Sequence, residues 1–358
     1  MIIISYLSPN SIIKLYLKIV TMTFLLESDS IKYILKKFLG EGITCKCYLG
    51  QKLSSENSEE LFAVKIFDPK YYKFYNNEVN ILSKISDNDN IIKLYEYGQG
   101  FITPLLNYNN NSNTEINLDF SKKEKIFFQI VEYASNGELK DYVLNTSTRI
   151  PEKISAKIFS KIVQTVKYLH LNNIAHCDIK PENVLLDKNF SPKLNDFGFS
   201  QMFRGEIGDY LLHQFNGTTI YCAPETRKAY IRGFDGVKND IFSLGVFLFV
   251  ITVGDFPFER ASFTDDKYRF IVKKNYSRFW ENFSSIELSD EFKDLINNLI
   301  CLNPTQRLDI DKILEHPWIK KYTRINYSDN YTQADFERDF YEQDIIDEFN
   351  SRKITIKS

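Results

Sequence analysis

Residues 176–183 read His176-Cys177-Asp178-Ile179-Lys180-Pro181-Glu182-Asn183, and Asp196-Phe197-Gly198 begins thirteen residues after Asn183. Asp178 can accept the proton of an attacking hydroxyl, and Lys180 can neutralise charge on a phosphoryl group in transfer. Asn183 and Asp196 are oxygen ligands suited to Mg²⁺, a hard cation that binds few carboxylates together with substrate phosphates. The stretch therefore indicates in-line phosphoryl transfer, in which catalysis is mainly positioning and electrostatic stabilisation.

The stretch resembles the catalytic loop of eukaryotic protein kinases, with Cys177 where most members carry arginine. A polar loop between two strands is the alternative, but Asp-Phe-Gly at the family's distance argues against it. The resemblance implies catalytic roles for Asp178, Lys180 and Asn183 and metal binding by Asn183 and Asp196. It makes His176 a structural residue next to Phe197.

Upstream, residues 33–50 and 61–67 alternate apolar and polar side chains, as strands do. The run Gly40-Glu41-Gly42-Ile43-Thr44-Cys45-Lys46-Cys47 resembles the kinase glycine-rich loop, whose backbone N–H groups approach phosphates. Here Cys45 replaces the third glycine and Cys47 replaces the valine that packs on adenine. Ala63-Val64-Lys65 resembles the lysine-bearing strand. On a predicted helix over 71–85, Glu78 is the expected partner of Lys65; a solvated surface glutamate is the alternative.

The next predicted strand, over 126–133, leads to a segment that resembles the kinase hinge. The resemblance implies that the Glu132 carbonyl and the Ala134 backbone hold adenine, and that Glu138 reaches the ribose or a basic substrate side chain. Leu185 would form the floor of the adenine pocket. The predicted ATP-binding set is Gly40, Glu41, Gly42, Cys47, Ala63, Lys65, Glu78, Glu132, Ala134, Glu138 and Leu185.

Residues 196–225, from Asp-Phe-Gly to Ala-Pro-Glu, have the character of a mobile loop. By resemblance, Thr218 and Glu182 face the substrate, and Thr218 with Lys180 indicates specificity for serine and threonine. Residues 213–216 read His-Gln-Phe-Asn, so the usual place of an activating phosphate holds neither serine nor threonine. With the arginine also replaced by Cys177, a phosphate would gain fewer charge-assisted hydrogen bonds. We hypothesise activity without phosphorylation of this segment; phosphorylation of Thr218 or Thr219 is the competing account.

Further along, residues 155–171 carry an apolar stripe of helical period, and residues 240–253 are nearly all apolar. The second run is too short to span a bilayer, so it predicts a buried core helix. The resemblance implies that Asp240 holds the backbone of the catalytic loop and that Arg307 pairs with Glu225.

The resemblance covers residues 33–319 and implies an α+β, two-lobed protein kinase fold. A small antiparallel β lobe with one helix would span 33–133, a hinge 132–138, and a larger, mainly helical lobe 139–319. Residues 1–32 are expected to be a packed or poorly ordered extension; a membrane anchor and a true start at Met22 are alternatives. The Asn-rich run 107–113 predicts a disordered insertion.

Residues 320–358 form an acidic tail in which Phe336, Phe340, Ile345 and Phe349 can share one helical face. Docking of that face on the large lobe and a solvated helix are both open. The acidic residues around it exclude a calmodulin-target helix, which would be basic.

The chain has 358 residues, 43% hydrophobic and 26% charged, with a formal net charge of −2. This composition is typical of a soluble protein and excludes a general nucleic-acid binder; we expect no membrane association. Its five cysteines form no disulfide framework and no C-x-x-C pair, which favours reduced thiols in the cytoplasm or the nucleus. Oligomeric state and substrate identity are not encoded in any motif.

The predicted function is a serine/threonine protein kinase that uses ATP and Mg²⁺ on protein substrates. It is most similar to the calcium/calmodulin-dependent group in its D-I-K-P-E-N, N-P-x-x-R and H-P-W-I segments. A pseudokinase scaffold is the alternative, suggested by Cys45, Cys47 and Cys177. The full polar set argues against it, since a scaffold needs no catalytic groups. A small-molecule kinase is disfavoured by the Ala-Pro-Glu segment.

Overall fold

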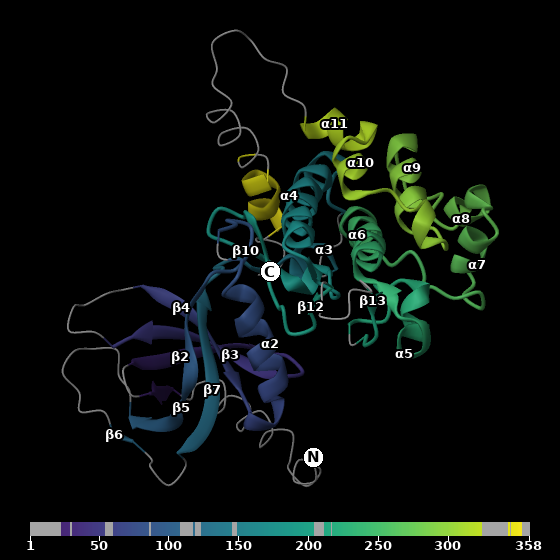
Figure 1. Ribbon diagram of the computed structural model, residues 1–358. Coiled ribbons are helices and arrows are strands. Elements are labelled where there is room, and N and C mark those ends of the chain that lie inside the picture. Colours follow the sequence, from purple (N-terminus) through teal and green to yellow (C-terminus); the bar gives the residue numbers. More distant parts are fainter. Residues whose placement is uncertain are drawn as a thin grey trace, which may run out of the picture. The chain divides into compact units, whose positions relative to one another are not determined.

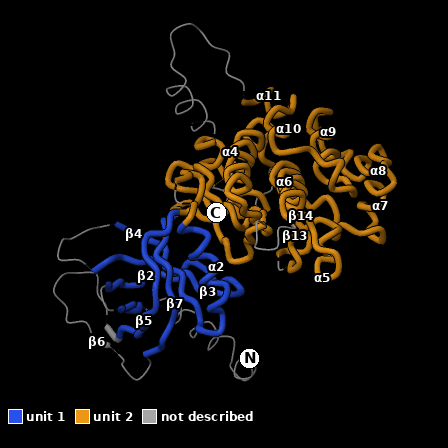
Figure 2. The backbone as a smooth tube through the Cα atoms, in the orientation of Figure 1, with its two compact units in different colours: residues 1–83, 93–133 blue, residues 84–92, 134–358 orange. Residues whose placement is uncertain are grey.

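The computed structural model describes residues 23–28, 31–53, 60–85, 87–107, 117–118, 123–144, 149–203, 211–215, 217–323, 343 and 345–352. The chain divides into two compact units (Figure 2). Unit 1 comprises residues 1–83 and 93–133, and unit 2 comprises residues 84–92 and 134–358.

Unit 1 is an antiparallel sheet accompanied by the helix α2 (Figure 1). Its elements are β1 (Phe24–Glu27), β2 (Lys32–Glu41), β3 (Cys45–Lys52), β4 (Leu61–Phe67), the 3-10 turn η2 (Pro69–Tyr71), α2 (Tyr72–Leu82), β5 (Leu94–Asn107), β6 (Asn117–Leu118) and β7 (Glu124–Glu132). The strand order is β1-β2-β3-β4-β7-β5-β6, and β1 also pairs with β5. Because β1 has a partner on both sides, the strands from β1 to β5 close into a ring, which removes exposed sheet edges.

Strand β1 lies within the extension over residues 1–32, which we expected to be packed or poorly ordered, and this part of it is packed into the sheet. Its register places Phe24 opposite both Leu35 of β2 and Pro104 of β5. Leu25 and Leu26 are buried. One edge of β2 and one edge of β5 thus gain backbone partners, and two leucines leave water. The sheet begins before residue 33; residues 1–22, with the question of Met22 as start, lie outside the described residues.

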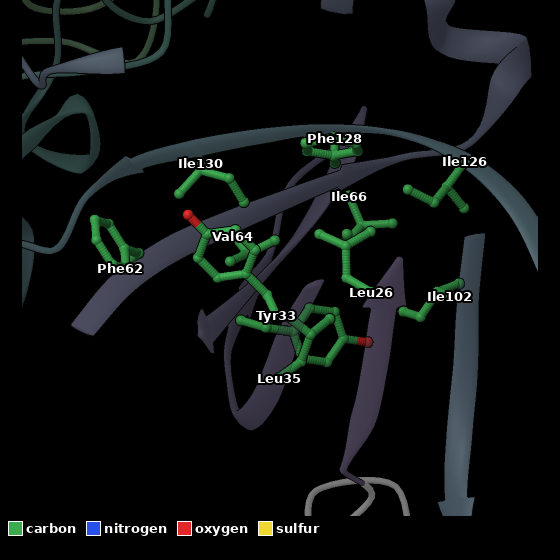
Figure 3. Packing of buried hydrophobic residues seen from close by; sticks show 11 residues of the cluster. Leu26, Tyr33, Leu35, Phe62, Val64, Ile66, Ile102, Ile126, Phe128 and Ile130 are labelled. Atoms are coloured by element: carbon green, nitrogen blue, oxygen red, sulfur yellow. The ribbon is translucent and has the colours of Figure 1, made fainter. Parts of the chain in front are cut away.

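The interior of the ring is filled by one face of each strand (Figure 3). Val64 and Ile66 of β4 point into this core, with Phe128 and Ile130 of β7 close by. Side chains alternate across a strand, so Lys65 lies on the opposite face of β4. That face meets α2, where Phe67 packs against Tyr75 and Val79. One strand therefore supplies core residues inward and candidate site residues outward.

Unit 2 is mainly helical, with short strand pairs near its start. Its elements are β8 (Gly137–Glu138), α3 (Leu139–Val143), α4 (Glu152–Leu171), β9 (Ile174–Ala175), η4 (Pro181–Asn183), β10 (Val184–Leu186), β11 (Pro192–Leu194), β12 (Gln201–Met202), β13 (Leu211–Leu212), η5 (Pro224–Lys228), α5 (Ala229–Arg232), β14 (Phe234–Asp235), α6 (Gly236–Val253), α7 (Tyr268–Val272), α8 (Tyr276–Glu281), α9 (Asp290–Leu299), η6 (Pro304–Gln306), α10 (Ile310–Leu314) and α11 (Pro317–Thr323).

Helix α6 forms the centre of unit 2, packed against α4 and α9. Asp235 caps its start by accepting a hydrogen bond from the Lys238 N–H, and Gly254, in the left-handed conformation at φ +76°, ends it. By length and composition α6 could cross a membrane, but 89% of it is buried inside the protein. It is therefore the core helix that the apolar run predicts.

The residues that the structure describes include only part of the Asn-rich run and part of the tail. Beyond Asn107, at the end of β5, the run lies outside the described residues, as do Phe336 and Phe340. Residues 345–352 are helical, and Ile345 and Phe349 are buried in unit 2. Of the two open alternatives for the tail, the structure favours docking.

Candidate active site

The catalytic-loop stretch leaves β9, passes through residues 176–180, and enters η4 with Pro181 at its first position. Proline suits that position because its fixed φ is already helical and its missing N–H is not needed. Cys177, at φ +65°, has a left-handed backbone, and so does Asp196 at φ +61°. Such conformations persist only where the surroundings hold them, and they concentrate at functional sites.

Asp240 of α6 holds the loop backbone, as the resemblance implies. Its carboxylate accepts hydrogen bonds from the His176 N–H (2.8 Å) and the Cys177 N–H (2.9 Å). It also lies 2.9 Å from Nε2 of His170. Asp240 is fully buried, so the core helix fixes the path of the loop.

Asp178 is the centre of a polar network within unit 2. One of its oxygens, Oδ1, accepts the Thr218 N–H at 2.8 Å. The other, Oδ2, lies 2.7 Å from Nζ of Lys180 and accepts Nδ2 of Asn183 at 2.9 Å. Lys180 also donates to the Thr218 hydroxyl at 2.7 Å. The structure thus brings together four residues that the sequence singled out.

The network keeps Asp178 ionised. Burial by itself would raise the pKa of this carboxyl group, which is 2% exposed. The charge of Lys180 and the hydrogen bonds from Lys180 and Thr218 outweigh burial, so the pKa lies below its ordinary value. An ionised carboxylate in a nearly dry place can orient a hydroxyl and accept its proton.

Thr218 reaches Asp178 because Gly217 lets the segment approach the loop closely. A Cβ at Gly217 would lie 2.2 Å from the Cys177 carbonyl oxygen, a distance that no side chain tolerates. The glycine therefore serves a close backbone approach, and Thr218 follows it directly into the network.

Asn183 and Asp196 are the predicted metal ligands, and their chemistry fits Mg²⁺. The Asn183 amide nitrogen donates to the carbonyl and to the carboxylate of Asp178, at 2.8 and 2.9 Å, which leaves its oxygen to serve a cation. Asp196 is partly exposed. Among the described residues no group of three or more His, Cys, Asp or Glu forms a closed metal centre. An open pair of oxygen ligands suits Mg²⁺, which takes its other ligands from water and phosphates.

His176 has the structural role predicted for it. It is fully buried, its Nε2 lies 3.2 Å from the Asn195 carbonyl oxygen, and its ring meets Phe197 edge-on at 5.0 Å. Burial lowers the pKa of the imidazole, against the nearby carboxylates that favour its charged form. A neutral, enclosed ring stabilises the Asp-Phe-Gly segment.

In unit 1, Lys65 and Glu78 form the expected ion pair, with Nζ and Oε1 2.6 Å apart and both side chains buried. The sheet register places Gly40 opposite Cys47, and Cys47 opposite Lys65. Residues directly opposite in an antiparallel pair share a face. Ala63, two residues before Lys65, lies on the same face. Sheet pairing thus gathers four of the predicted ATP-binding residues.

Gly40 in β2, and Gly42 just beyond its end, have open space next to their Cα atoms. A Cβ added to Gly40 would meet nothing within 4 Å, and one on Gly42 would meet only the Cys45 carbonyl oxygen at 3.8 Å. Neither glycine is required by packing among the described residues. A ligand that needs close approach to the backbone, such as a triphosphate, supplies a reason for both.

Cys47 adds a neutral group to this face. Burial raises the pKa of its thiol to about 11, although the charge of Lys65 acts in the opposite direction. Glu41, also in the predicted set, is exposed and lies 3.9 Å from Lys46 across the hairpin. Cys47 and Glu41 can therefore line a nucleotide site, and the Cys47 thiol is not a reactive thiolate.

The predicted hinge residues divide between the two units. Glu132, in unit 1, donates its backbone N–H to the Lys93 carbonyl at 2.9 Å. In unit 2, Ala134 is buried, and Glu138 pairs with Leu185 between β8 and β10. Burial, then the charge of Asp141, raises the pKa of Glu138, and Glu182 adds to that rise. Unit 2 therefore carries an acidic group of residues around Glu138.

The Glu225–Arg307 pair is present as expected. The Arg307 guanidinium donates to both Glu225 oxygens, at 2.6 and 2.8 Å. Its other donors reach the carbonyls of Cys301, Lys238 and Leu302. The Ala-Pro-Glu segment gains two further bonds that sequence reasoning missed: the Ala223 N–H donates to Asn239, and the Ser243 hydroxyl to the Tyr221 carbonyl. The sequence could have indicated these bonds, because Asn239, Asp240 and Ser243 are spaced so that they lie near one another on one helix.

Sequence reasoning also missed what surrounds Cys177. Its side chain, 2% exposed, lies in an apolar cluster with Ala175, Leu212, Ala229 and Phe234, and Phe203 and Phe215 pack against it. Strand β13 pairs with β14 in the same region. Burial raises the pKa of the Cys177 thiol, so it remains neutral. The segment after Asp-Phe-Gly is anchored here by apolar contact.

This combination of fold and loop defines a class of protein. The protein kinase domain family matches residues 33–319, so the chain belongs to that family. The predicted α+β kinase fold is confirmed.

Among curated proteins the chain is similar to CBL-interacting protein kinase 30 of Oryza sativa subsp. japonica. The two are 32% identical over 299 residues, covering 82% of this chain and 55% of the rice protein. It is also 32% identical over 298 residues to CBL-interacting serine/threonine-protein kinase 7 of Arabidopsis thaliana, covering 81% of this chain and 60% of that protein. These relatives belong to the calcium/calmodulin-dependent group that the sequence indicated. The chain spans a little over half of their length.

Proposed function

We propose that this chain is a serine/threonine protein kinase that transfers the γ-phosphoryl group of ATP to protein hydroxyls, with Mg²⁺ as cofactor. The observation that carries the proposal is the closed network of Asp178, Lys180, Asn183 and Thr218. Every member is oriented by another, and the whole is built on a loop that the core helix fixes. A scaffold protein would have no use for such a network.

The chemistry follows from these groups. The substrate oxygen bonds to the γ-phosphorus, the bond from that phosphorus to the β–γ bridging oxygen breaks, ADP leaves, and the hydroxyl proton passes to Asp178. Lys180 stabilises charge on the group in transfer, and Thr218 keeps Lys180 and Asp178 in register. Asn183 and Asp196 would hold Mg²⁺, which when bound screens the phosphate charges.

The groups of unit 1 supply the other half of the proposal. Lys65, oriented by Glu78 at 2.6 Å, would hold the α- and β-phosphates. Gly40 and Gly42 would admit the triphosphate to the backbone, because neither position is filled by the chain itself.

Incubation of the purified chain with radiolabelled ATP, Mg²⁺ and a generic basic protein tests the activity. Labelled protein that disappears without Mg²⁺ and in Asp196→Ala supports the proposal. If wild type and Asp196→Ala both bind ATP without labelling any protein, the scaffold alternative replaces it.

For the substrate, we propose a mild preference for Arg or Lys upstream of the target hydroxyl. The carboxylates of Glu138, Asp141 and Glu182 lie near the ammonium groups of Lys140 and Lys180. Because Lys180 is paired with Asp178, the balance of charge around Glu138 is negative. Because such pairs are partly solvated, we expect a gain of only about 1 kcal/mol or less, a few-fold in affinity. A positional-scanning peptide library measures it, and enrichment of acidic residues at upstream positions would refute it.

The relatives named above are described as CBL-interacting. Because they are much longer than this chain, we propose for it the kinase activity and protein substrates alone. No disulfide joins the cysteines of the described residues, which supports our proposal of a cytoplasmic or nuclear location.

A further inference from the structure

The helix at residues 345–352 docks on unit 2 through one face. It is the yellow helix near the label α4 in Figure 1. Ile345, Phe349 and Arg352 are 1, 0 and 3% exposed. Their spacings of four and three residues place them on the same side of a helix, while Asp347 and Asn350 face solvent. Burial of an arginine on such a face requires specific partners.

Phe349 completes an aromatic cluster from three distant parts of the chain. Its ring lies 5.0 Å from that of Tyr142 in α3 and 5.5 Å from that of Phe190 in the turn between β10 and β11. Tyr142 and Phe190 meet edge-on at 5.9 Å. These separations lie in the favourable range for aromatic pairs, so each contact stabilises the cluster beyond the effect of burial. The helix thus presses Tyr142 against the β10–β11 hairpin.

Arg352 fastens both sides of the connection between α3 and α4. Its guanidinium donates to the Tyr142 carbonyl at 3.1 Å and to the Arg149 carbonyl at 2.5 Å, while Nε bonds Glu348 at 2.8 Å. Tyr142 is near the C-terminal end of α3, where carbonyls lack partners inside the helix and attract cations. Arg352 is therefore a cap for α3 supplied from the tail.

Helix α3 in turn holds Glu138. It begins directly after that residue. The Tyr142 hydroxyl donates to the Asn136 carbonyl at 3.0 Å. Asn136 is tied to the β10–β11 hairpin, because its N–H donates to the Leu186 carbonyl at 3.0 Å and its amide to the Asp187 carbonyl at 2.7 Å. The tail helix, α3 and the segment that carries Glu138 are thus linked by a continuous series of contacts.

We propose that Phe349 and Arg352 are positioning residues: through α3 they hold Glu138 where it meets a basic side chain of the substrate. Three carboxylates, those of Glu138, Asp141 and Glu182, lie near two ammonium groups, those of Lys140 and Lys180. Because Lys180 is itself paired with Asp178, the balance of charge is negative and favours a cationic ligand over a ribose hydroxyl. The proposal rests on the proposed kinase function, and it predicts that the tail supports substrate binding instead of blocking it.

The kinetic test compares wild type and Arg352→Ala on two peptides, one with an upstream arginine and one with alanine in its place. We expect the KM for the arginine peptide to rise about three- to tenfold in the variant, a loss of about 1 kcal/mol. The KM for the alanine peptide and kcat should stay within twofold. Phe349→Leu, which keeps the apolar contact, should restore most of the effect of Phe349→Ala. Equal changes on both peptides, a change in the KM for ATP alone, or no change would overturn the proposal.

A second measurement needs no activity. Hydrogen exchange of the full chain should show faster exchange at amides 136–144 in Arg352→Ala than in wild type. The matched control is Asn350→Ala on the exposed face of the same helix. Unchanged exchange in Arg352→Ala would contradict the proposed contact even if the kinase function fails. A normal kinase with faster exchange but no peptide-specific KM change would refute the positioning role alone.

Discussion

Asp178 is the residue on which the chemistry depends most. Asp178→Asn keeps the shape of the side chain but removes the charge that pairs with Lys180 and the acceptor for the substrate proton. We expect kcat to fall by about 10²–10⁴-fold, the usual contribution of a positioned acid or base. Affinity for ATP should change little, since Asp178 acts on the hydroxyl. Steady-state kinetics with nucleotide titration measures both, and wild-type turnover in the variant would contradict the assignment.

Lys65→Met is the companion change in unit 1, and we expect it also to lower kcat/KM by about 100-fold or more. Because the Lys65–Glu78 pair is buried, removing one partner leaves a bare charge that costs about 3–5 kcal/mol. Thermal unfolding is therefore recorded for Lys65→Met and for Lys65→Met/Glu78→Gln. A double variant with restored stability but no activity would separate the catalytic loss from the structural one.

The roles of some single residues could be predicted from the sequence, and those of others could not. Asp178, Lys180 and Asn183 could be predicted because their roles depend on spacing within one short loop. The surroundings of Cys177 could not, since Leu212, Phe215 and Phe234 come from separate elements and carry no motif. The sequence showed that Cys177 replaces the usual arginine, but it did not show which residues surround the cysteine.

At the scale of elements, the described parts of the segment from Asp-Phe-Gly to Ala-Pro-Glu are held by apolar packing and by pairing of β13 with β14. The cluster around Cys177 anchors these parts beside Gly217 and Thr218, so we infer that no phosphate is needed to anchor them. We therefore predict that protein expressed in eukaryotic cells keeps its activity after phosphatase treatment. Mass spectrometry of residues 199–222 is the accompanying check, and loss of activity with loss of a phosphate mapped there would sink the idea.

A matched pair of variants tests the anchor itself. Phe215 packs against the cluster and meets Phe234 at 5.9 Å, whereas the neighbouring Gln214 is exposed. Phe215→Ala should lower kcat/KM about tenfold because Thr218 loses its support, and Gln214→Ala should not.

Helix α6 and the Ala-Pro-Glu segment depend on Arg307. Its side chain is fully buried and donates to a carboxylate and three carbonyls. Arg307→Lys keeps the charge but cannot reproduce this planar set of donors, so we expect a loss of about 2–4 kcal/mol in the free energy of unfolding. Urea denaturation measures the loss. A change below about 0.5 kcal/mol, as for an exposed pair, would show that the pair is structurally unimportant.

At the scale of the whole molecule, the antiparallel sheet of unit 1 and the helical unit 2 follow from alternation and helical periodicity in the sequence. Two features of the fold could not be predicted in this way. Strand β1 is four residues long, and its pairing with both β2 and β5 depends on edges that only the folded sheet presents. The face of the C-terminal helix was visible in the sequence, but its partners Tyr142 and Arg149 lie some two hundred positions earlier.

All of the predictions about activity depend on transfer of phosphate to aliphatic hydroxyls by the residues around Asp178. The most direct test incubates the full chain with Mg·ATP and a peptide that offers serine, threonine and tyrosine in equal number, flanked by basic residues. Mass spectrometry then identifies the modified residue, with Asp178→Asn as the blank. We expect phosphoserine and phosphothreonine in wild type and neither in the blank. Phosphotyrosine as the main product, or equal phosphorylation by the blank, would contradict it.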